Sequence, residues 1–188
     1  MIYPIVAYGD PVLKKVAVDI TKDYEGLTEV IENMWETMYA ANGIGLAAPQ
    51  IGKSIRLFVV DATAFEDDEP ELADFKKVFI NARIIEEDGE KWPFNEGCLS
   101  IPKIREDISR HEEIVIEYLD ENFKMHKDTF SGMAARVIQH EYDHIDGILF
   151  VDHLSPLRKR LLSGKLNDIT KGNVDVDYRM KFPVLKKR

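Results

Sequence analysis

The sequence predicts an α+β domain in which a mostly antiparallel sheet packs around a central helix, with a further helix in the C-terminal part of the chain. Strand-like segments follow one another through short turns instead of alternating with helices, which favours antiparallel pairing. The segments with helical periodicity stand on either side of these strands. With 188 residues, 45% of them hydrophobic and 31% charged, the chain has the size and composition of a globular domain. We therefore predict that residues 1–188 form a single domain.

The first predicted helix runs from Gly26 to Ala41. Its apolar side chains recur at spacings of three and four, which places them on one face of a helix. They are Leu27, Val30, Ile31, Met34, Trp35 and Met38. Asn42-Gly43 follows directly and is a typical helix stop, because both residues tolerate a left-handed backbone. This segment is expected to be a core helix.

Apolar patterns predict four strands, at residues 56–61, 77–84, 113–120 and 124–130. The last two are separated by Glu121-Asn122-Phe123, so they are expected to form a hairpin. Between the first two strands lies the acidic, proline-containing segment 62–75, which we predict to be an exposed loop that can include a helical turn. The sequence indicates no role for its most acidic part, residues 66–74.

Two more helices are predicted after the strands. The first runs from Ser131, a good N-cap residue, to about Ile145, with Gly147 as its C-terminal stop. Ser155-Pro156 begins the other, because an N-cap residue is followed by a first-turn proline, and we predict that it ends near Gly164.

The chain shows no segment suited to a membrane. No apolar run approaches the roughly 20 residues that cross a bilayer, and the segment that starts at Met1 has no basic region ahead of a long apolar core. We therefore expect a cytoplasmic protein. Cys98 is the single cysteine, so no internal disulfide can form and a reducing compartment would keep its thiol available.

Charge is unevenly distributed along the chain. Residues 1–152 contain 15 Lys and Arg against 31 Asp and Glu, whereas residues 153–188 contain 10 against 3. We predict that residues 153–188 form a basic helix and tail. Two interpretations of this tail remain open: a solvated helix rich in basic residues, or a patch that docks on an anionic partner such as nucleic acid.

The stretch Gln139 to His144, within the second predicted helix, contains two histidines four residues apart. At about 100 degrees per residue, His140 and His144 lie about 40 degrees apart around the helix, so both imidazoles can reach one point beside it. Glu141 is turned about 100 degrees from His140, which lets it approach a metal-bound water without coordinating the metal. This pattern is typical of metal hydrolases, although a surface helix can contain it by chance.

The third ligand decides the class of metal site. Metzincins place a histidine where this chain has Phe150, and thermolysin-like enzymes use a later glutamate, which is absent after Glu141. The remaining histidines are expected on the surface; they are His111, His126 and His153. Cys98 can be interpreted as a small apolar residue buried in the core. However, Gly97 lets the backbone approach another group there, and the surrounding stretch does not continue a strand pattern. A thiolate with two imidazoles would leave one position open for water, which indicates catalysis.

The segment 43–52 is rich in glycine and alanine, so its backbone can come close to a ligand. Gln50 offers an amide donor of the kind that stabilises an oxyanion. The spacing of the glycines matches neither phosphate-binding loop, because Ala47 and Ala48 stand where those loops need glycine. A plain turn after the first helix is the alternative interpretation.

Taken together, three segments resemble the ordered motifs of the peptide deformylase family; they are Gly43 to Gln50, Glu96 to Ser100 and Gln139 to His144. The flanking chain fits the general length of that family. The resemblance implies hydrolysis of the formyl group from the N-terminal formylmethionine of new polypeptides, with release of formate. It also implies one divalent metal ion, Fe²⁺ in the cell, for which Zn²⁺, Ni²⁺ or Co²⁺ can substitute.

The resemblance also implies roles for individual residues. The metal ligands would be Cys98, His140 and His144. Glu141 would be the general base, which takes a proton from the attacking water and delivers it to the departing amine. Gln50 and the backbone N–H of Leu99 would stabilise the oxyanion, while the backbone of Gly45 positions the substrate. Glu96 is expected to orient one of the ligands.

Helix spacing suggests a substrate pocket beside these ligands. Met133 and Val137 continue the helical stripe of the two histidines, and with Ile44 they would enclose the unbranched methionine side chain. Core packing is an equal alternative for both helix residues. Arg136 is expected to rim this pocket, and Arg105 to bind the peptide backbone or a carboxylate.

The resemblance makes N-formylmethionyl nascent peptides the expected partners, with no membrane and no DNA. A basic segment over residues 153–188 would allow contact with ribosomal RNA. Asp143 faces away from the metal ligands and is expected to pair with an arginine. Two competing functions stay open: a zinc metallopeptidase that cleaves peptide bonds, and a structural Cys/His2 metal-binding module.

Overall fold

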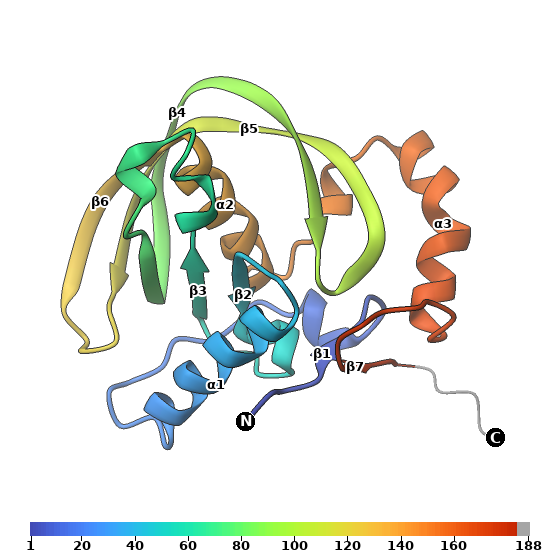
Figure 1. Ribbon diagram of the computed structural model, residues 1–188, viewed down its shortest axis with the longest axis horizontal. Helices are drawn as coiled ribbons and strands as arrows, with labels where there is room; N and C mark the ends of the chain where they lie inside the picture. The colour runs from blue at the N-terminus through green and yellow to red at the C-terminus, as the bar shows by residue number, and fades with distance from the viewer. Residues whose placement is uncertain (184–188) are drawn as a thin grey trace.

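The computed structural model describes residues 1–183, and the predicted α+β fold is confirmed (Figure 1). The helices are α1 (Leu27–Ala40), α2 (Gly132–Ile145) and α3 (Pro156–Thr170), and the strands are β1 (Ile5–Val6), β2 (Gly45–Ala47), β3 (Leu57–Asp61), β4 (Lys76–Cys98), β5 (Ile101–Leu119), β6 (Met125–Ser131) and β7 (Met180–Lys181). Within these residues, β2-β3-β4-β5-β6 form an antiparallel sheet in that order, and β1 and β7 form a parallel pair. Among the helices within residues 1–183, none combines the length and the apolar composition that a membrane span requires.

The antiparallel sheet packs against α1 on one face and α2 on the other. Strand β3 shows why a helix packs on each face, because successive residues of a strand point to opposite faces of the sheet. Phe58 and Val60 belong to the apolar cluster that includes α2, whereas Leu57 and Val59 belong to the cluster that includes α1. β3 is therefore apolar on both faces, and α2 is the central helix around which the strands lie (Figure 1).

α3 packs on a third apolar cluster, together with the first part of β5. The prediction that this helix ends near Gly164 is wrong, because α3 continues to Thr170. Buried apolar side chains recur at helical spacing around this glycine; they are Leu162, Leu166 and Ile169. Their burial outweighs the cost of an internal glycine, which is about 1 kcal/mol. Gly172, with a φ of 73°, reverses the chain after the helix.

β4 and β5 are much longer than predicted and arch together over the molecule (Figure 1). The sequence indicated strands over 77–84 and 113–120, whereas β4 continues to Cys98. The prediction that Cys98 lies outside a strand pattern is therefore wrong. The more buried positions of β4 alternate as far as Glu96, but one of them is a carboxylate, which hid the strand; they are Trp92, Phe94 and Glu96.

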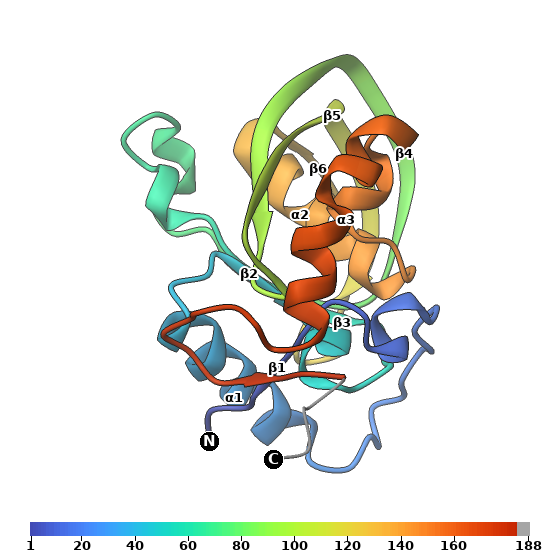
Figure 2. The same ribbon diagram turned by 90° about the vertical axis from the view of Figure 1, so that its right-hand side faces the viewer.

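The acidic loop 62–75 contains two short 3₁₀ turns and projects from the body of the molecule (Figure 2). Ser131 occupies the N-cap position of α2 as predicted, but its side chain makes no capping hydrogen bond. The carboxylate of Glu69 instead accepts the backbone N–H of Met133, at 3.0 and 3.2 Å. A carboxylate is favourable here because a helix N-terminus carries partial positive charge. Part of the acidic loop thus caps α2.

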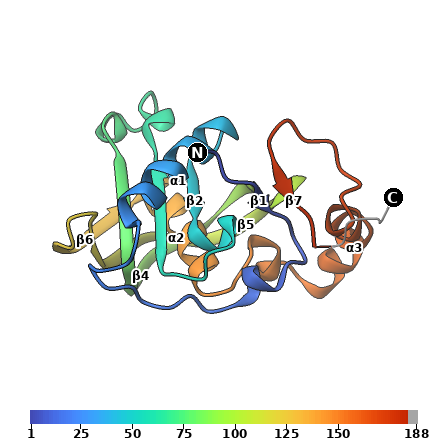
Figure 3. The ribbon, with the colours of Figure 1, turned by 90° about the horizontal axis from the view of Figure 1, so that it is seen from below.

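β7 lies beside β1 (Figure 3), with Met180 opposite Ile5 and Lys181 opposite Val6. Side-chain alternation cannot reveal strands of two or three residues, so β1, β2 and β7 were not predicted. The last part of the predicted basic tail, residues 184–188, lies outside the described residues.

Candidate metal centre

The three predicted ligands meet between α2 and the end of β4. The Sγ atom of Cys98 lies 3.3 Å from Nε2 of His144, and one ligand atom from each of Cys98, His140 and His144 lies within 4.8 Å of the other two. The Nδ1 atom of His140 lies 2.9 Å from a carboxylate oxygen of Glu96. Because Nδ1 is engaged, Nε2 is the atom that His140 can offer to a metal.

This donor set fits a divalent metal ion. Two ligands of a tetrahedral ion stand roughly 3.5 Å apart at the usual bond lengths, which is close to the 3.3 Å between Cys98 and His144. One thiolate with two imidazoles is compatible with iron, zinc, nickel or cobalt. The buried Oε2 atom of Glu141 has no hydrogen-bond partner within residues 1–183, as expected of a group that faces a ligand.

Glu141 lies on α2 directly against the backbone of Gly45 in β2. A Cβ atom added to Gly45 would stand 2.4 Å from Oε1 of Glu141, so the close approach requires glycine. Glu141 is buried, and its burial raises the pKa of the carboxyl group to about 7. The side chain of Glu141 is therefore held at the edge of the site by packing against β2.

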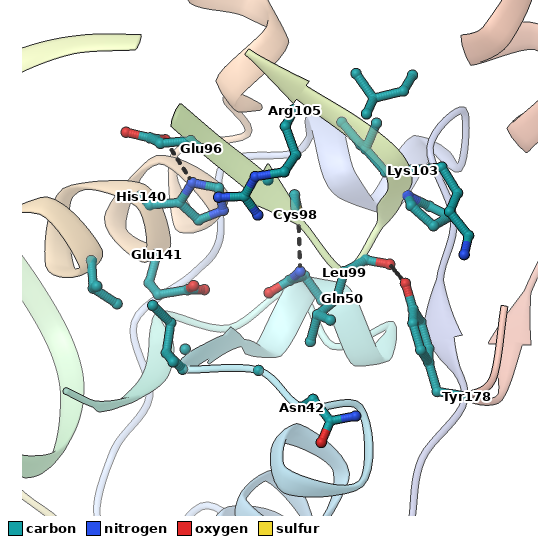
Figure 4. A pocket seen from close by; sticks show the side chains of 18 of the residues that line it. Asn42, Gln50, Glu96, Cys98, Leu99, Lys103, Arg105, His140, Glu141 and Tyr178 are labelled. Carbon is teal, nitrogen blue, oxygen red and sulfur yellow. Dashed lines mark hydrogen bonds and ion pairs between the residues drawn. The ribbon is translucent and has the colours of Figure 1, made fainter. Parts of the chain in front are cut away.

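The segment 43–52 is not a plain turn, because it forms β2 and a 3₁₀ turn that contains Gln50. The side-chain oxygen of Gln50 accepts the backbone N–H of Ala47 at 2.9 Å. This contact fixes the amide, whose Nε2 lies 3.4 Å from Sγ of Cys98 and 3.3 Å from Oγ of Ser100. The donor group of a buried amide therefore points at the candidate metal centre (Figure 4).

Glu96 is a buried carboxylate with charged partners. It accepts hydrogen bonds from Arg110 at 2.7 and 3.0 Å and from Arg136 at 2.9 Å. Burial by itself would raise the pKa of Glu96, but the hydrogen bonds from His140 and Arg110 outweigh it and hold this pKa well below its usual range. An ionised carboxylate beside Nδ1 of His140 fixes the orientation of that ring.

A cavity of about 480 Å³ opens beside the metal centre (Figure 4). Its lining includes the residues predicted for catalysis and for the substrate; they are Ile44, Gly45, Gln50, Glu96, Leu99, Arg105, Met133, Val137 and Glu141. Met133 and Val137 also belong to the cluster between α2 and the sheet, so they take part in core packing as well. Arg136 contributes to the lining, but its guanidinium is buried against Glu96 and does not stand at a rim.

Arg105 is an exposed residue at the edge of this cavity, and its Nε donates to the side chain of Asn95 at 2.9 Å. Asp143 accepts a hydrogen bond from Arg110 at 2.8 Å and thus pairs with an arginine. The remaining histidines lie apart from the ligand set, each in contact with another protein oxygen; they are His111, His126 and His153.

Two residues near the centre were not found from the sequence. Arg110 occupies a buried position on β5, two residues after buried Ile108, so strand alternation contained a usable signal. Tyr178 lines the cavity and donates its hydroxyl hydrogen to the carbonyl of Leu99 at 2.7 Å. No local pattern indicates this contact, because it depends on how residues 171–183 fold back.

Comparison with known proteins identifies close relatives. The sequence model of the family "Polypeptide deformylase" matches residues 2–160. Peptide deformylases of Christiangramia forsetii and Flavobacterium johnsoniae are 60% and 57% identical to this chain, over 100% of it and 99% of their own length. A solved peptide deformylase from Legionella pneumophila is similar with a TM-score of 0.79 and 38% identity, over 89% of this chain and 95% of that one. The solved peptide deformylase from Thermotoga maritima is similar with a TM-score of 0.74 and 42% identity, over 83% of this chain and 99% of that one.

Proposed function

The chain belongs to the polypeptide deformylase family, and from this membership we propose how its own residues carry out the reaction. The enzyme hydrolyses the formyl group from the N-terminal formylmethionine of newly made polypeptides and releases formate. The observation that carries the assignment of roles is the position of Glu141 at the Cys98, His140 and His144 cluster, in a cavity that also exposes the Gln50 amide.

We propose that one divalent ion is held by Cys98, His140 and His144, with Fe²⁺ in the cell and Zn²⁺, Ni²⁺ or Co²⁺ as substitutes. The mixed thiolate and imidazole donor set supports this choice. When bound, the ion acts as a Lewis acid that lowers the pKa of a coordinated water toward neutrality. Glu96 keeps the ring of His140 in place from the side away from the ion, through the hydrogen bond at Nδ1.

Glu141 moves the proton. Its carboxylate accepts a proton from the attacking water and afterwards returns it to the departing nitrogen, so that formate and a free amino group are the products. Support comes from its placement: Oε1 lies against the backbone of Gly45, and Oε2 has no hydrogen-bond partner in the described chain.

The formyl oxygen becomes negatively charged as its carbon becomes tetrahedral. We assign its stabilisation to Nε2 of Gln50 and the backbone N–H of Leu99, since preorganised donors are most effective where charge develops. The backbone of Gly45 would position the substrate main chain, and Arg105 would bind the peptide backbone or a carboxylate at the exposed edge. The methionine side chain would be enclosed by Ile44, Met133 and Val137.

Formate release from a formyl-Met-Ala-Ser peptide tests the function, with acetyl-Met-Ala-Ser and unblocked Met-Ala-Ser as controls. A deformylase releases formate from the first peptide and leaves both controls intact. A metallopeptidase would cleave the unblocked peptide, and a structural metal module would act on none of the three.

Gly45→Ala is expected to reduce kcat/KM for the formylated peptide by roughly 100-fold, because displacing a reacting group by about 1 Å has an effect of that size. The added methyl group would meet Oε1 of Glu141 at 2.4 Å and push the carboxylate away. Gly164→Ala is the matched control, since a Cβ atom there meets nothing within 4 Å. It should keep full activity and raise stability by about 0.5–1 kcal/mol. Equal activity of both variants would contradict the assigned position of Glu141.

We propose that residues 1–188 act as one catalytic unit in the cytoplasm, where new polypeptides emerge, without a membrane or DNA partner. The segment 153–183 supports this view, because it contributes residues to the cavity and pairs with β1.

We also propose that the exposed face of α3 contacts ribosomal RNA. This face carries Arg160 and Lys165 beside Leu157 and Leu161, which are 70% and 65% exposed.

The double variant Arg160→Glu, Lys165→Glu is expected to weaken ribosome binding about tenfold at low salt and to reduce its dependence on salt concentration. Activity on short peptides should not change. Sedimentation of the enzyme with ribosomes at several salt concentrations measures the effect, and Lys22→Glu, Lys124→Glu is the charge-matched control. Deletion of residues 165–188 is a poorer test, because it would also remove buried Leu166. Identical binding by both double variants would contradict the proposed contact.

A further inference from the structure

Residues 171–183 form a return segment that brings the chain back from α3 to the cavity. Gly172 reverses the direction with a φ of 73°, and β7 then pairs with β1 (Figure 3). The backbone N–H groups of Ile5 and Ala7 donate to the carbonyls of Arg179 and Lys181, at 2.8 and 2.9 Å. This segment lies beyond residue 160, where the match to the family model ends.

Side chains along the return segment alternate between exposed and half-buried positions. Of the half-buried ones, Val174 and Met180 pack on the apolar cluster that includes α3. Val176 and Tyr178, which lie between them, line the cavity beside the metal centre. An aliphatic and an aromatic side chain are therefore available to a ligand instead of being used by the core.

Tyr178 is tied to the part of the chain that carries the metal centre. Its hydroxyl donates to the carbonyl of Leu99 at 2.7 Å (Figure 4), and the backbone N–H of Tyr8 donates to the carbonyl of the next residue, Ser100, at 2.8 Å. Leu99 directly follows the ligand Cys98 and supplies the proposed oxyanion donor. The return segment thus holds the chain immediately after the thiolate.

Tyr178 lines the cavity but does not belong to the walls assigned to the first residue of the peptide. The walls assigned to the methionine side chain come from Ile44, which directly precedes β2, and from α2. Figure 4 shows Tyr178 on the other side of Cys98 from Glu141. An extended peptide advances about 3.3–3.6 Å per residue. Because Tyr178 contacts the residue next to Cys98, the second and third residues of a bound substrate can reach its ring.

We propose that Val176 and Tyr178 form a wall that binds the second and third residues of the formylated peptide and favours apolar side chains there, and that Tyr178 also positions Leu99. The inference rests on the proposed function. An aromatic ring with a neighbouring aliphatic group offers apolar contact area and leaves the tyrosine hydroxyl to its own hydrogen bond. The wall would add affinity for longer substrates without touching the reacting atoms.

Two substrates separate the contribution of the wall to binding from effects on the chemical step. They are formyl-Met amide, which ends after the first residue, and formyl-Met-Leu-Leu. The measured quantity is the ratio of kcat/KM for the longer to the shorter substrate. In the metal-loaded enzyme, Tyr178→Ala is expected to lower this ratio about tenfold and Val176→Ala about threefold, because apolar contacts of this size are lost. The change in this ratio should lie mainly in KM for the longer substrate, since contacts far from the reacting carbon bind substrate and transition state alike. The lost hydroxyl of Tyr178→Ala lowers kcat on both substrates and so cancels in the ratio.

Tyr178→Phe keeps the ring and removes the hydroxyl, so it isolates the positioning role. The ratio should stay within about twofold of wild type, while kcat falls about fivefold on both substrates, as expected for one lost hydrogen bond of about 1 kcal/mol. Asp175→Ala is the matched control, because this exposed residue belongs to the same segment but does not line the cavity. It should leave both rates unchanged.

Unchanged ratios in Tyr178→Ala and Val176→Ala would overturn the wall, and an unchanged kcat in Tyr178→Phe would overturn the positioning role. If Tyr178→Ala does not fold, as judged by its thermal transition, the Val176→Ala ratio decides. A wild-type enzyme that releases no formate from either substrate would instead refute the proposed function.

Discussion

Glu141→Gln is expected to lower kcat for formate release by about 1000-fold, within the range measured for the loss of a general base. Glutamine has nearly the same shape as glutamate and fits the space left by Gly45, but it cannot accept the proton. The bound metal should remain, because Glu141 does not belong to the ligand cluster. The rate on formyl-Met-Ala-Ser and the metal content per chain measure the two effects.

Glu112→Gln is a suitable control for this substitution, since Glu112 is an exposed acid on β5 and lies outside the cavity. It should leave kcat unchanged. A Glu141→Gln enzyme that keeps more than about a tenth of the wild-type kcat would show that another group takes the proton, because a lost general base has a far larger effect.

Cys98→Ala is expected to abolish both metal retention and activity. Two imidazoles alone make a weak site, so we expect affinity for the ion to fall by at least about 1000-fold and the metal to be lost during gel filtration. A chelator should lower the unfolding temperature of the wild type, because a ligand bound to the folded state stabilises it. The same chelator should not affect Cys98→Ala.

His153→Ala provides the comparison for the loss of a ligand. This histidine contacts Asp143 at 2.7 Å and lies outside the ligand cluster, so the variant should hold one ion per chain. If Cys98→Ala also retained one ion per chain and remained sensitive to the chelator, a different residue would have to be the third ligand.

Local periodicity was enough to predict the parts of the fold that depend on neighbours in sequence. α1 lies within one residue of its predicted ends because its apolar side chains recur at helical spacing. α2 does so because Ser131 and Gly147 mark its start and its stop. The meeting of His140 and His144 follows from the same geometry, since residues four apart share one face of a helix. The hairpin of β5 and β6 also lies where its turn residues indicated.

Contacts between distant segments could not be predicted from such patterns. The approach of Cys98 to α2 depends on the course of β4, whose last part carries the polar residues Asn95 and Glu96 and so lacks an apolar signature. Excluding the other candidates for a third ligand pointed to Cys98, and the resemblance to a known family supported that connection. The carboxylate of Glu69 accepts the N–H of Met133 in α2, and the hydroxyl of Tyr178 donates to the carbonyl of Leu99. Both contacts join segments far apart in the chain, so a sequence contains no local trace of either.

β1 leaves the ribosome long before its partner strand exists, because Ile5 pairs with Met180 near the other end of the described chain. The proposed metal ligands and Glu141 have all been synthesised by residue 144, while the return segment is made later. Joining residues so far apart in sequence carries an entropic cost that only the completed chain can offset. We therefore expect the enzyme to mature in two stages during translation. The metal-binding core forms first, and binding of longer substrates begins when β7 pairs with β1.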